Sequence, residues 1–369
     1  MIALLPCGGV KIVLNQSCIN YTFPHSVRFC LATEQNSCSC KGLILRLMVC
    51  LLSVWPMLLH AEWYRDTQGI MGTEVSVSLW ADDPTQGQRA IQSIMTEMRR
   101  INAALSPYLE NSELSKVNRD AAKRAVKISD ELSHLIKQSL HYSRLSNGAF
   151  DITFASLAQF YDYRQGGKPS AEQIKTNLPA INYQLLALDT EKHTLKYSDE
   201  RIKIDLGGIA KGYAVDRGVA LLKQQGIKHA SVSAGGDSRL LGSRRDREWL
   251  IGIKHPRQTD GGKEVAIHLP LSDTALSTSG DYERYFIDQA TGERIHHIVN
   301  PRTGKSASEV MSVTILGENG IDTDPLSTTV FVMGVNSGLA LVNRLEGFDA
   351  IIIDAKGTVH YSDGLMAAN

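Results

Sequence analysis

The alternation of apolar and polar residues predicts several half-buried strands. Val75, Val77 and Leu79 fall on one face of the stretch from Glu74 to Leu79, which is the period of a strand with one buried side. The Lys356-Gly357 pair between two β-rich stretches predicts a closing hairpin. Further strands are expected at 202–206, 229–234, 311–316 and 349–354.

A period of three to four residues predicts helices between these strands. Ile91, Ile94 and Met98 recur at this spacing, with Thr85 as the expected N-cap. Strands in pairs mixed with helices indicate an α+β fold more than a regular βαβ series. No G-x-G-x-x-G follows a strand, so a Rossmann domain is not expected. Further helices are expected at about 130–145, 209–225 and 324–333.

Composition indicates a globular protein without a strong overall charge. The chain is 43% hydrophobic, which is enough for a sizeable core and unlike a disordered sequence. Lys plus Arg and Asp plus Glu both number 39, so no basic field would gather nucleic acid. An anionic ligand must therefore be bound by a local site.

The N-terminal region has the layout of an export signal. A basic start at Lys41 and Arg46 leads into an apolar stretch that ends at Ala61, with cleavage expected after Ala61. Because Leu59 is large for the position that precedes a cleavage site, an uncleaved anchor remains an alternative. We expect residues 1–40 to be an extension from a start codon assigned too early, and residues 62–369 to form one mixed α/β unit. All six cysteines precede residue 51, so this unit has no thiol for a disulfide, a nucleophile or a metal.

A double glycine at the start of a helix is the first candidate site. Asp205 ends a β-rich stretch, Gly207 and Gly208 follow it, and Lys211 lies one turn into the expected helix. Free N–H groups at a helix start, with a lysine beside them, suit a phosphate. A plain strand-to-helix turn with a solvated lysine fits the same residues equally well.

The second candidate is a group of oxygen ligands around Pro325, which is expected in the first turn of a helix. Asp324 and Thr328 are four residues apart and share one face, with Ser327 beside them. A carboxylate with hydroxyls suits a hard cation such as Mg²⁺. Alternatively, Asp324 caps its own helix and Thr328 bonds back to the chain.

Adjacent histidines and a few aromatic residues add possible contacts. In an extended chain His296 and His297 point to opposite sides, so only one of them can face a given site as a base. The stretch Pro301–Gly304 after them is expected to be a turn. Phe150 and Tyr108 are able to stack on a planar ring, although single aromatics more often belong to the core.

Taken together and in chain order, these stretches resemble the ApbE family of FAD:protein FMN transferases. The resemblance is carried by DLGGIAKGYAVD, SAGGDSRLLG, STSGDYERYF, HHIVNPRTG and DPLSTTVFVMG, and it covers nearly all of the expected mature chain. It implies mainly antiparallel sheets packed with helices. Pro325 replaces the usual alanine and Asn300 a common aspartate, neither of which is an expected metal ligand. No cysteine follows the apolar stretch, which argues against the lipoprotein form.

The resemblance also implies a set of site residues. Metal ligation falls to the Gly208 carbonyl, Asp324, Ser327 and Thr328, and catalytic roles fall to Lys211, Asp324 and His297. FAD contacts are implied at Met71, Tyr108, Ala149, Phe150, Asp151, Asp205, Lys211 and Ile298.

The reaction that the resemblance implies is a transfer of FMN from FAD to a threonine or serine hydroxyl, with Mg²⁺ and with release of AMP. The implied acceptors are exported subunits of Na⁺-pumping NADH:quinone oxidoreductases or Rnf-type complexes. We therefore expect a periplasmic location or one on the periplasmic face of the inner membrane. Two alternatives remain open: an FAD pyrophosphatase, and a non-enzymatic FAD-binding protein.

Overall fold

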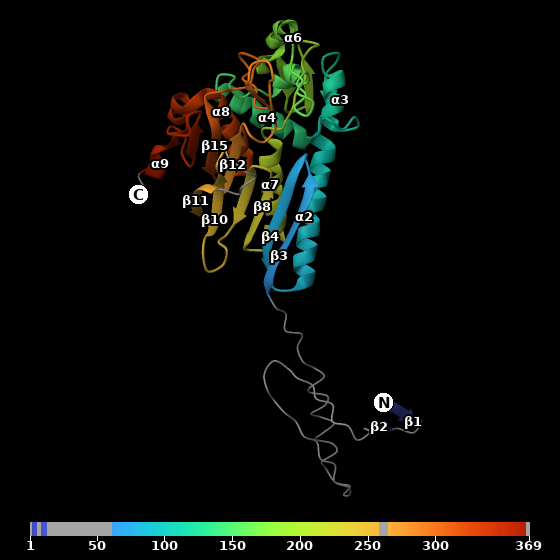
Figure 1. The fold of residues 1–369 in the computed structure, drawn as a ribbon. Helices are drawn as coiled ribbons and strands as arrows, with labels where there is room; N and C mark the ends of the chain where they lie inside the picture. The colour runs from blue at the N-terminus through green and yellow to red at the C-terminus, as the bar shows by residue number, and fades with distance from the viewer. Residues whose placement is uncertain (1, 6–8, 13–60, 258–264, 367–369) are drawn as a thin grey trace. The chain divides into compact units, whose positions relative to one another are not determined.

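The computed structural model describes residues 2–5, 9–12, 61–257 and 265–366, which Figure 1 draws as a coloured ribbon. The chain divides into two units, Met1–Leu58 and Leu59–Asn369. In the first unit, β1 (Ile2–Leu5) pairs antiparallel with β2 (Gly9–Ile12). The expected signal or anchor lies outside the described residues apart from Ala61, so the division into 1–40, 41–61 and 62–369 stays a prediction.

The second unit is built on an eight-stranded sheet with the order β17-β16-β15-β12-β9-β8-β4-β3. Every neighbouring pair in this sheet is antiparallel, which confirms the expected α+β class. Val75, Val77 and Leu79 are fully or almost fully buried, as their alternation predicted. The strands are β3 (Glu62–Ile70), β4 (Thr73–Ala81), β8 (Ala230–Ala234), β9 (Asp237–Leu241), β12 (Ala275–Gly280), β15 (Val310–Gly317), β16 (Asp349–Asp354) and β17 (Val359–Tyr361).

Smaller elements complete this unit. The expected closing hairpin is confirmed by the antiparallel pair β16 and β17, with Gly357 in the left-handed region at φ 86°. The other strands are β5 (Val126–Lys127), β6 (Leu186–Asp189), β7 (Thr194–Tyr197), β10 (Trp249–Lys254), β11 (Val265–Leu271), β13 (Tyr285–Ile287) and β14 (Arg294–His296). The short helices are α3 (Glu113–Asp120), α5 (Ala155–Ala158), α6 (Ala171–Asn177), α9 (Asp363–Met366), η1 (Ile152–Phe154), η2 (Leu178–Ala180) and η3 (Tyr183–Leu185).

The strand expected at 202–206 is wrong. Ile202, Ile204 and Leu206 are buried as in a strand, but none of the strands in the described residues pairs with them. Instead, the side chain of Asn118 donates to the Ile204 carbonyl at 2.9 Å and accepts from the Ile204 N–H at 2.9 Å. One amide side chain therefore satisfies backbone groups that a neighbouring strand would otherwise have satisfied.

In the described part of the second unit, the longer helices supply the apolar faces: α2 (Pro84–Leu105), α4 (Asp130–Leu145), α7 (Ala210–Gln224) and α8 (Gly320–Val342). In Figure 1, α2 runs along β3 and β4. Its periodic residues are buried, as expected, but its N-cap is Asp83 and not Thr85. The Asp83 carboxylate accepts from the N–H of Gln86 at 2.9 Å, and Pro84 takes the first helical position.

Helix α8 begins earlier and extends further than 324–333, so Pro325 lies inside it and not in its first turn. The cause is a cap from another helix. The carboxylate of Asp216, on α7, accepts from the N–H groups of Gly320 and Ile321, both at 2.8 Å. Gly334, at φ 77°, kinks α8. Helix α8 is long and apolar enough to cross a membrane. However, more than half of its most apolar stretch is buried in the protein, as in a core helix.

Candidate functional site

The centre of the site is the ammonium group of Lys211 between two carboxylates. Its Nζ lies 3.0 Å from Oδ2 of Asp237 and 3.2 Å from each oxygen of Asp324. It also donates to the Gly207 carbonyl at 2.8 Å. Three elements meet here, because Lys211 belongs to the first turn of α7, Asp324 to α8 and Asp237 to the start of β9.

The carboxylates are buried, and this changes the protonation of the group. Asp237 and Asp324 are 2% and 3% exposed. Burial raises the pKa of Asp324 to about 7, and the charge of Asp237 acts in the same direction. Burial alone would lower the pKa of Lys211, but the two carboxylates raise it above its ordinary value. Lys211 is therefore charged at neutral pH, and one ammonium faces two acidic side chains.

The start of α7 offers less free backbone than the sequence suggested. The N–H groups of Ile209 and Ala210 donate to the Leu206 carbonyl, and the N–H of Gly212 donates to Asp324 at 3.0 Å. The Asp205 carboxylate accepts from the N–H of Gly207 at 2.7 Å. The positive charge at the start of α7 is therefore mainly that of the Lys211 ammonium.

The expected metal ligands lie together beside this centre. A Cβ atom placed on Gly208 would lie 3.4 Å from Oγ1 of Thr328, so these two residues are neighbours. Oγ of Ser327 donates to the carbonyl of Asp324 at 2.9 Å, a bond within α8. Ser279, on β12, contacts the hydroxyls of Ser327 and Thr328 at 2.9 and 3.3 Å. Within residues 61–257 and 265–366, no group of three or more His, Cys, Asp or Glu residues could hold a metal. The expected ligand set is of another kind, since it combines the Asp324 carboxylate with hydroxyl and carbonyl oxygens.

The donor chemistry fits a hard divalent cation. Among the expected ligands, Asp324 supplies a carboxylate, and Ser327 and Thr328 supply hydroxyls. Asp237 and Asp324 together exceed the charge of Lys211 by one unit when both are ionised. Oxygen ligands and excess negative charge are what Mg²⁺ requires, with further positions left for water or phosphate. A bound cation, in addition to the Lys211 ammonium, would compensate the remaining negative charge of the two carboxylates.

The two histidines lie in different surroundings, as their adjacency predicted. His296 is buried, its Nε2 lies 2.6 Å from the Ala307 carbonyl, and its ring packs edge-on against Phe331. His297 donates its backbone N–H to Arg284, whereas its Nδ1 is buried with no hydrogen-bond partner in the described part of the chain. Burial, together with nearby positive charges, lowers the pKa of His297 to about 3. His297 therefore offers a neutral ring with an unused nitrogen.

The expected FAD contacts are divided between exposed and internal positions. Tyr108 is 81% exposed, so its ring is free to stack on a ligand. Phe150 packs against Gly208, where a Cβ atom would lie 3.1 Å from its ring. Ala149 and Ile298 are buried. The Asp151 carboxylate caps η1 and accepts hydrogen bonds from the N–H groups of Thr153 and Tyr183, so the protein itself supplies donors to both of its oxygens.

Met71 and the turn around it are connected to the histidine segment. Met71 and Gly72 link β3 to β4 with left-handed backbones, at φ 58° and 70°. Arg284 donates to the Gly72 carbonyl at 3.2 Å, and the carbonyl of Arg284 accepts from the N–H of His297. The expected turn after the histidines is confirmed by the bond from the Gly304 N–H to the Asn300 carbonyl at 2.8 Å.

Asp237, Ser279 and Arg284 were missed as site residues when the sequence was read alone. Each lies in a stretch that carries the family resemblance, and Asp237 directly follows a double glycine at the start of a strand. That glycine pair was the available signal, because backbone without side chains lets a second element approach closely. A Cβ atom on Gly236 would indeed overlap the Thr278 carbonyl.

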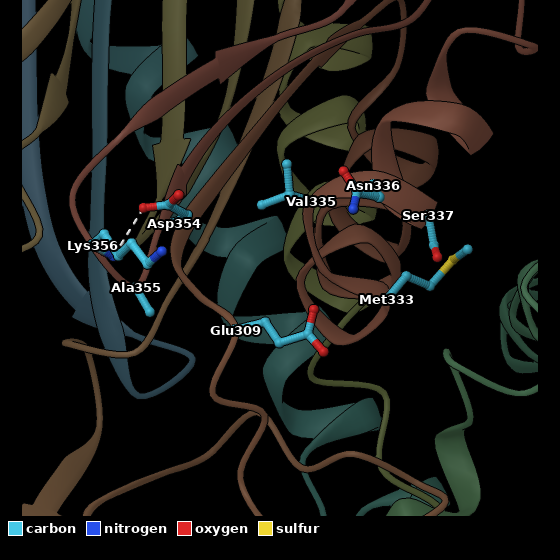
Figure 2. Close-up of a pocket in the computed structure, with 8 residues that line it drawn as sticks. All are labelled: Glu309, Met333, Val335, Asn336, Ser337, Asp354, Ala355 and Lys356. Atoms are coloured by element: carbon cyan, nitrogen blue, oxygen red, sulfur yellow. Dashed lines mark hydrogen bonds between the residues drawn. The ribbon is translucent and has the colours of Figure 1, made fainter.

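Among the described residues, some open pockets lie outside this centre, and two of them are notable. One, of about 520 Å³, is lined by Asp151, Tyr183 and Arg302 among others. The other, of about 420 Å³, lies at the kink of α8 (Figure 2), where Glu309, Asn336 and Asp354 surround it. None of the residues implied by the resemblance lines this second pocket, so it is separate from the Lys211 centre.

Comparison with known proteins agrees with the fold and the motifs. The ApbE family model matches residues 71–352. A relative from Treponema pallidum, named FAD:protein FMN transferase, is 28% identical over 321 residues and covers 82% of this chain and 88% of its own. A relative of the same name from Klebsiella pneumoniae is 29% identical over 287 residues, and the match covers 77% of this chain and 87% of the relative. The crystal structure of an ApbE protein from Thermotoga maritima superposes with a TM-score of 0.76 at 32% identity, and covers 83% of this chain and 99% of its own.

The antiparallel sheet and the helices packed on it are thus shared with a solved ApbE protein. The chain belongs to the ApbE family.

Proposed function

We propose that this protein is an FAD:protein FMN transferase, which moves FMN from FAD to a threonine or serine hydroxyl of another protein with the help of Mg²⁺. The proposal is supported by the names of its relatives and by family membership. The observation that carries it is the convergence of Lys211, Asp324, Gly208 and Thr328, which provides an ammonium and oxygen ligands at one place. A diphosphate needs both kinds of group.

Mg²⁺ would be held by Asp324 and Thr328, with the Gly208 carbonyl and Ser327 as the remaining expected ligands. When bound, it would supply positive charge to the diphosphate oxygens, on which negative charge grows during phosphoryl transfer. Lys211 contributes a second positive charge beside it, and its rigid placement avoids reorganisation during the reaction.

The reaction joins the acceptor hydroxyl oxygen to the phosphorus of the FMN half of FAD. The bond between this phosphorus and the oxygen that bridges to AMP breaks, the hydroxyl proton is released, and AMP leaves. His297 is the proposed orienting residue, because its ring is neutral near pH 7 and one of its two nitrogens then carries no proton. Tyr108 would hold the flavin ring by stacking.

The proposed setting is the periplasm or the periplasmic face of the inner membrane. The basic and apolar stretch that ends at Ala61 supports export of the chain. The proposed acceptors are exported subunits of Na⁺-pumping NADH:quinone oxidoreductases or Rnf-type complexes. Membrane association would come only from the N-terminal segment, if that segment stays uncleaved.

One incubation tests the proposed function against its alternatives. The protein is mixed with FAD, Mg²⁺ and a candidate acceptor, and the acceptor is then weighed by intact mass spectrometry while free nucleotides are separated. A mass gain of one FMN less water on the acceptor supports the transferase. Free FMN and AMP without a mass gain indicates a pyrophosphatase, and unchanged FAD indicates a binding protein.

A further inference from the structure

A buried carboxylate that the proposed function does not use lies directly against Lys211. Asp237 is as buried as Asp324, and its Oδ2 is 3.0 Å from the ammonium nitrogen. It reaches Lys211 from β9, whereas Asp324 reaches it from α8. The ammonium is therefore held from two independent elements and from the Gly207 carbonyl on its own segment.

The contacts of Lys211 conflict with a cation on Asp324. Both oxygens of Asp324 lie 3.2 Å from the lysine nitrogen, and one of them also accepts from the Gly212 N–H. A divalent ion that binds this carboxylate must compete with the ammonium for the same oxygens. If the cation took both Asp324 oxygens and the ammonium had no other acceptor, a charged group would remain buried and unpaired. This would cost considerable free energy.

We infer that Asp237 is a positioning residue, which retains the Lys211 ammonium beside the diphosphate when Asp324 binds the divalent cation. The inference rests on the proposed function. Asp237 and the Gly207 carbonyl provide a second set of acceptors, so the lysine exchanges one partner and stays in place. Without Asp237, Lys211 depends on Asp324 and competes more strongly with the cation.

A double-mutant cycle on the full chain tests this competition. Mg²⁺ binding is measured by isothermal titration calorimetry for the wild type, Asp237→Asn, Lys211→Met and the double variant. We expect Asp237→Asn to weaken Mg²⁺ binding by about tenfold while Lys211 is present, and by less than about threefold in the Lys211→Met background, where no ammonium competes. An equal loss in both backgrounds would overturn the inference, because Asp237 would then act on the cation directly.

A second measurement needs no substitution in the buried pair. The lysine side-chain nitrogens of the wild-type chain are labelled with ¹⁵N, and the Nζ signal assigned through Lys211→Met is followed as Mg²⁺ is added. The signal is expected to shift but to keep its protection from solvent exchange, as an ammonium still bound to Asp237 would. Loss of protection on Mg²⁺ binding would contradict a retained lysine.

The acceptor mass assay on the same wild-type preparation separates this inference from the proposed function. Transfer by the wild type, together with an equal loss of Mg²⁺ affinity in both backgrounds, refutes only the role of Asp237. Absence of transfer refutes the proposed function, whatever the binding data show.

Discussion

Gly212 on α7 donates its backbone N–H to the carboxylate of Asp324 on α8, at 3.0 Å. The bond requires the two helices to touch. A Cβ atom at position 212 would overlap the Gly320 carbonyl and lie 2.7 Å from the Cβ of Asp324. The absence of a side chain at Gly212 therefore sets the distance between the two helices that carry the site.

Gly212→Ala is expected to destabilise the protein by about 2 kcal/mol, because the added methyl group meets backbone that cannot move aside easily. Urea denaturation of the full chain measures this loss. Gly69→Ala is the matched control, since a Cβ atom there meets nothing within 4 Å, and it should stay within about 0.5 kcal/mol of the wild type. Equal stability of the two variants would show that α7 and α8 are not in close contact.

Tyr108→Ala is expected to weaken FAD binding by about tenfold without loss of stability. The ring is 81% exposed and contributes little to the core, whereas stacking on a flavin is worth about 1 kcal/mol or more. Fluorescence titration with FAD measures the affinity. Tyr361→Ala, which removes another exposed tyrosine from β17, should bind FAD as the wild type does. Unchanged affinity in Tyr108→Ala would remove this residue from the flavin site.

The burial of His297 predicts a specific dependence of stability on pH. Its folded pKa of about 3 lies below the ordinary value of 6.5, so folding favours the neutral ring. This contribution to stability is complete above pH 6.5 and is lost as the pH falls from 6.5 towards 3. Thermal midpoints between pH 7.5 and 4 should therefore fall more steeply for the wild type than for His297→Asn. The control His134→Asn, at an exposed position on α4, should follow the wild type. Parallel curves for all three proteins would mean that His297 titrates normally.

Local pattern predicted much of the fold. The alternation in β4 and the helical period in α2 both mark a face that is buried in the structure, because one-sided burial leaves its period in the sequence. The same reasoning failed at 202–206, since the side chain of Asn118, 86 residues before Ile204, takes the place of a strand. Helix α8 began earlier than expected because its cap, Asp216, lies on another helix.

The candidate site was predictable only in part, for a similar reason. Lys211 and Asp324 belong to stretches that carry the family resemblance, and the structure brings them within 3.2 Å. That Asp237 also reaches Lys211 depends on the meeting of β9 with α7, which no local spacing encodes. Sequence pattern identifies the helices and strands, but the second carboxylate at Lys211 follows from how those elements pack.

Transfer by Asp324→Asn in the presence of Mg²⁺ tests the proposed role of the Asp324 carboxylate. Lys211 keeps Asp237 as a partner in this variant, so the protein should remain folded, as circular dichroism would show. Asp322→Asn is the control, since that carboxylate lies on the same helix but contacts Tyr142. We predict that the acceptor gains the mass of FMN with the wild type and with Asp322→Asn, and gains none with Asp324→Asn or with EDTA in place of Mg²⁺. Wild-type rates of transfer by a folded Asp324→Asn would show that this carboxylate does not hold a cation on the diphosphate.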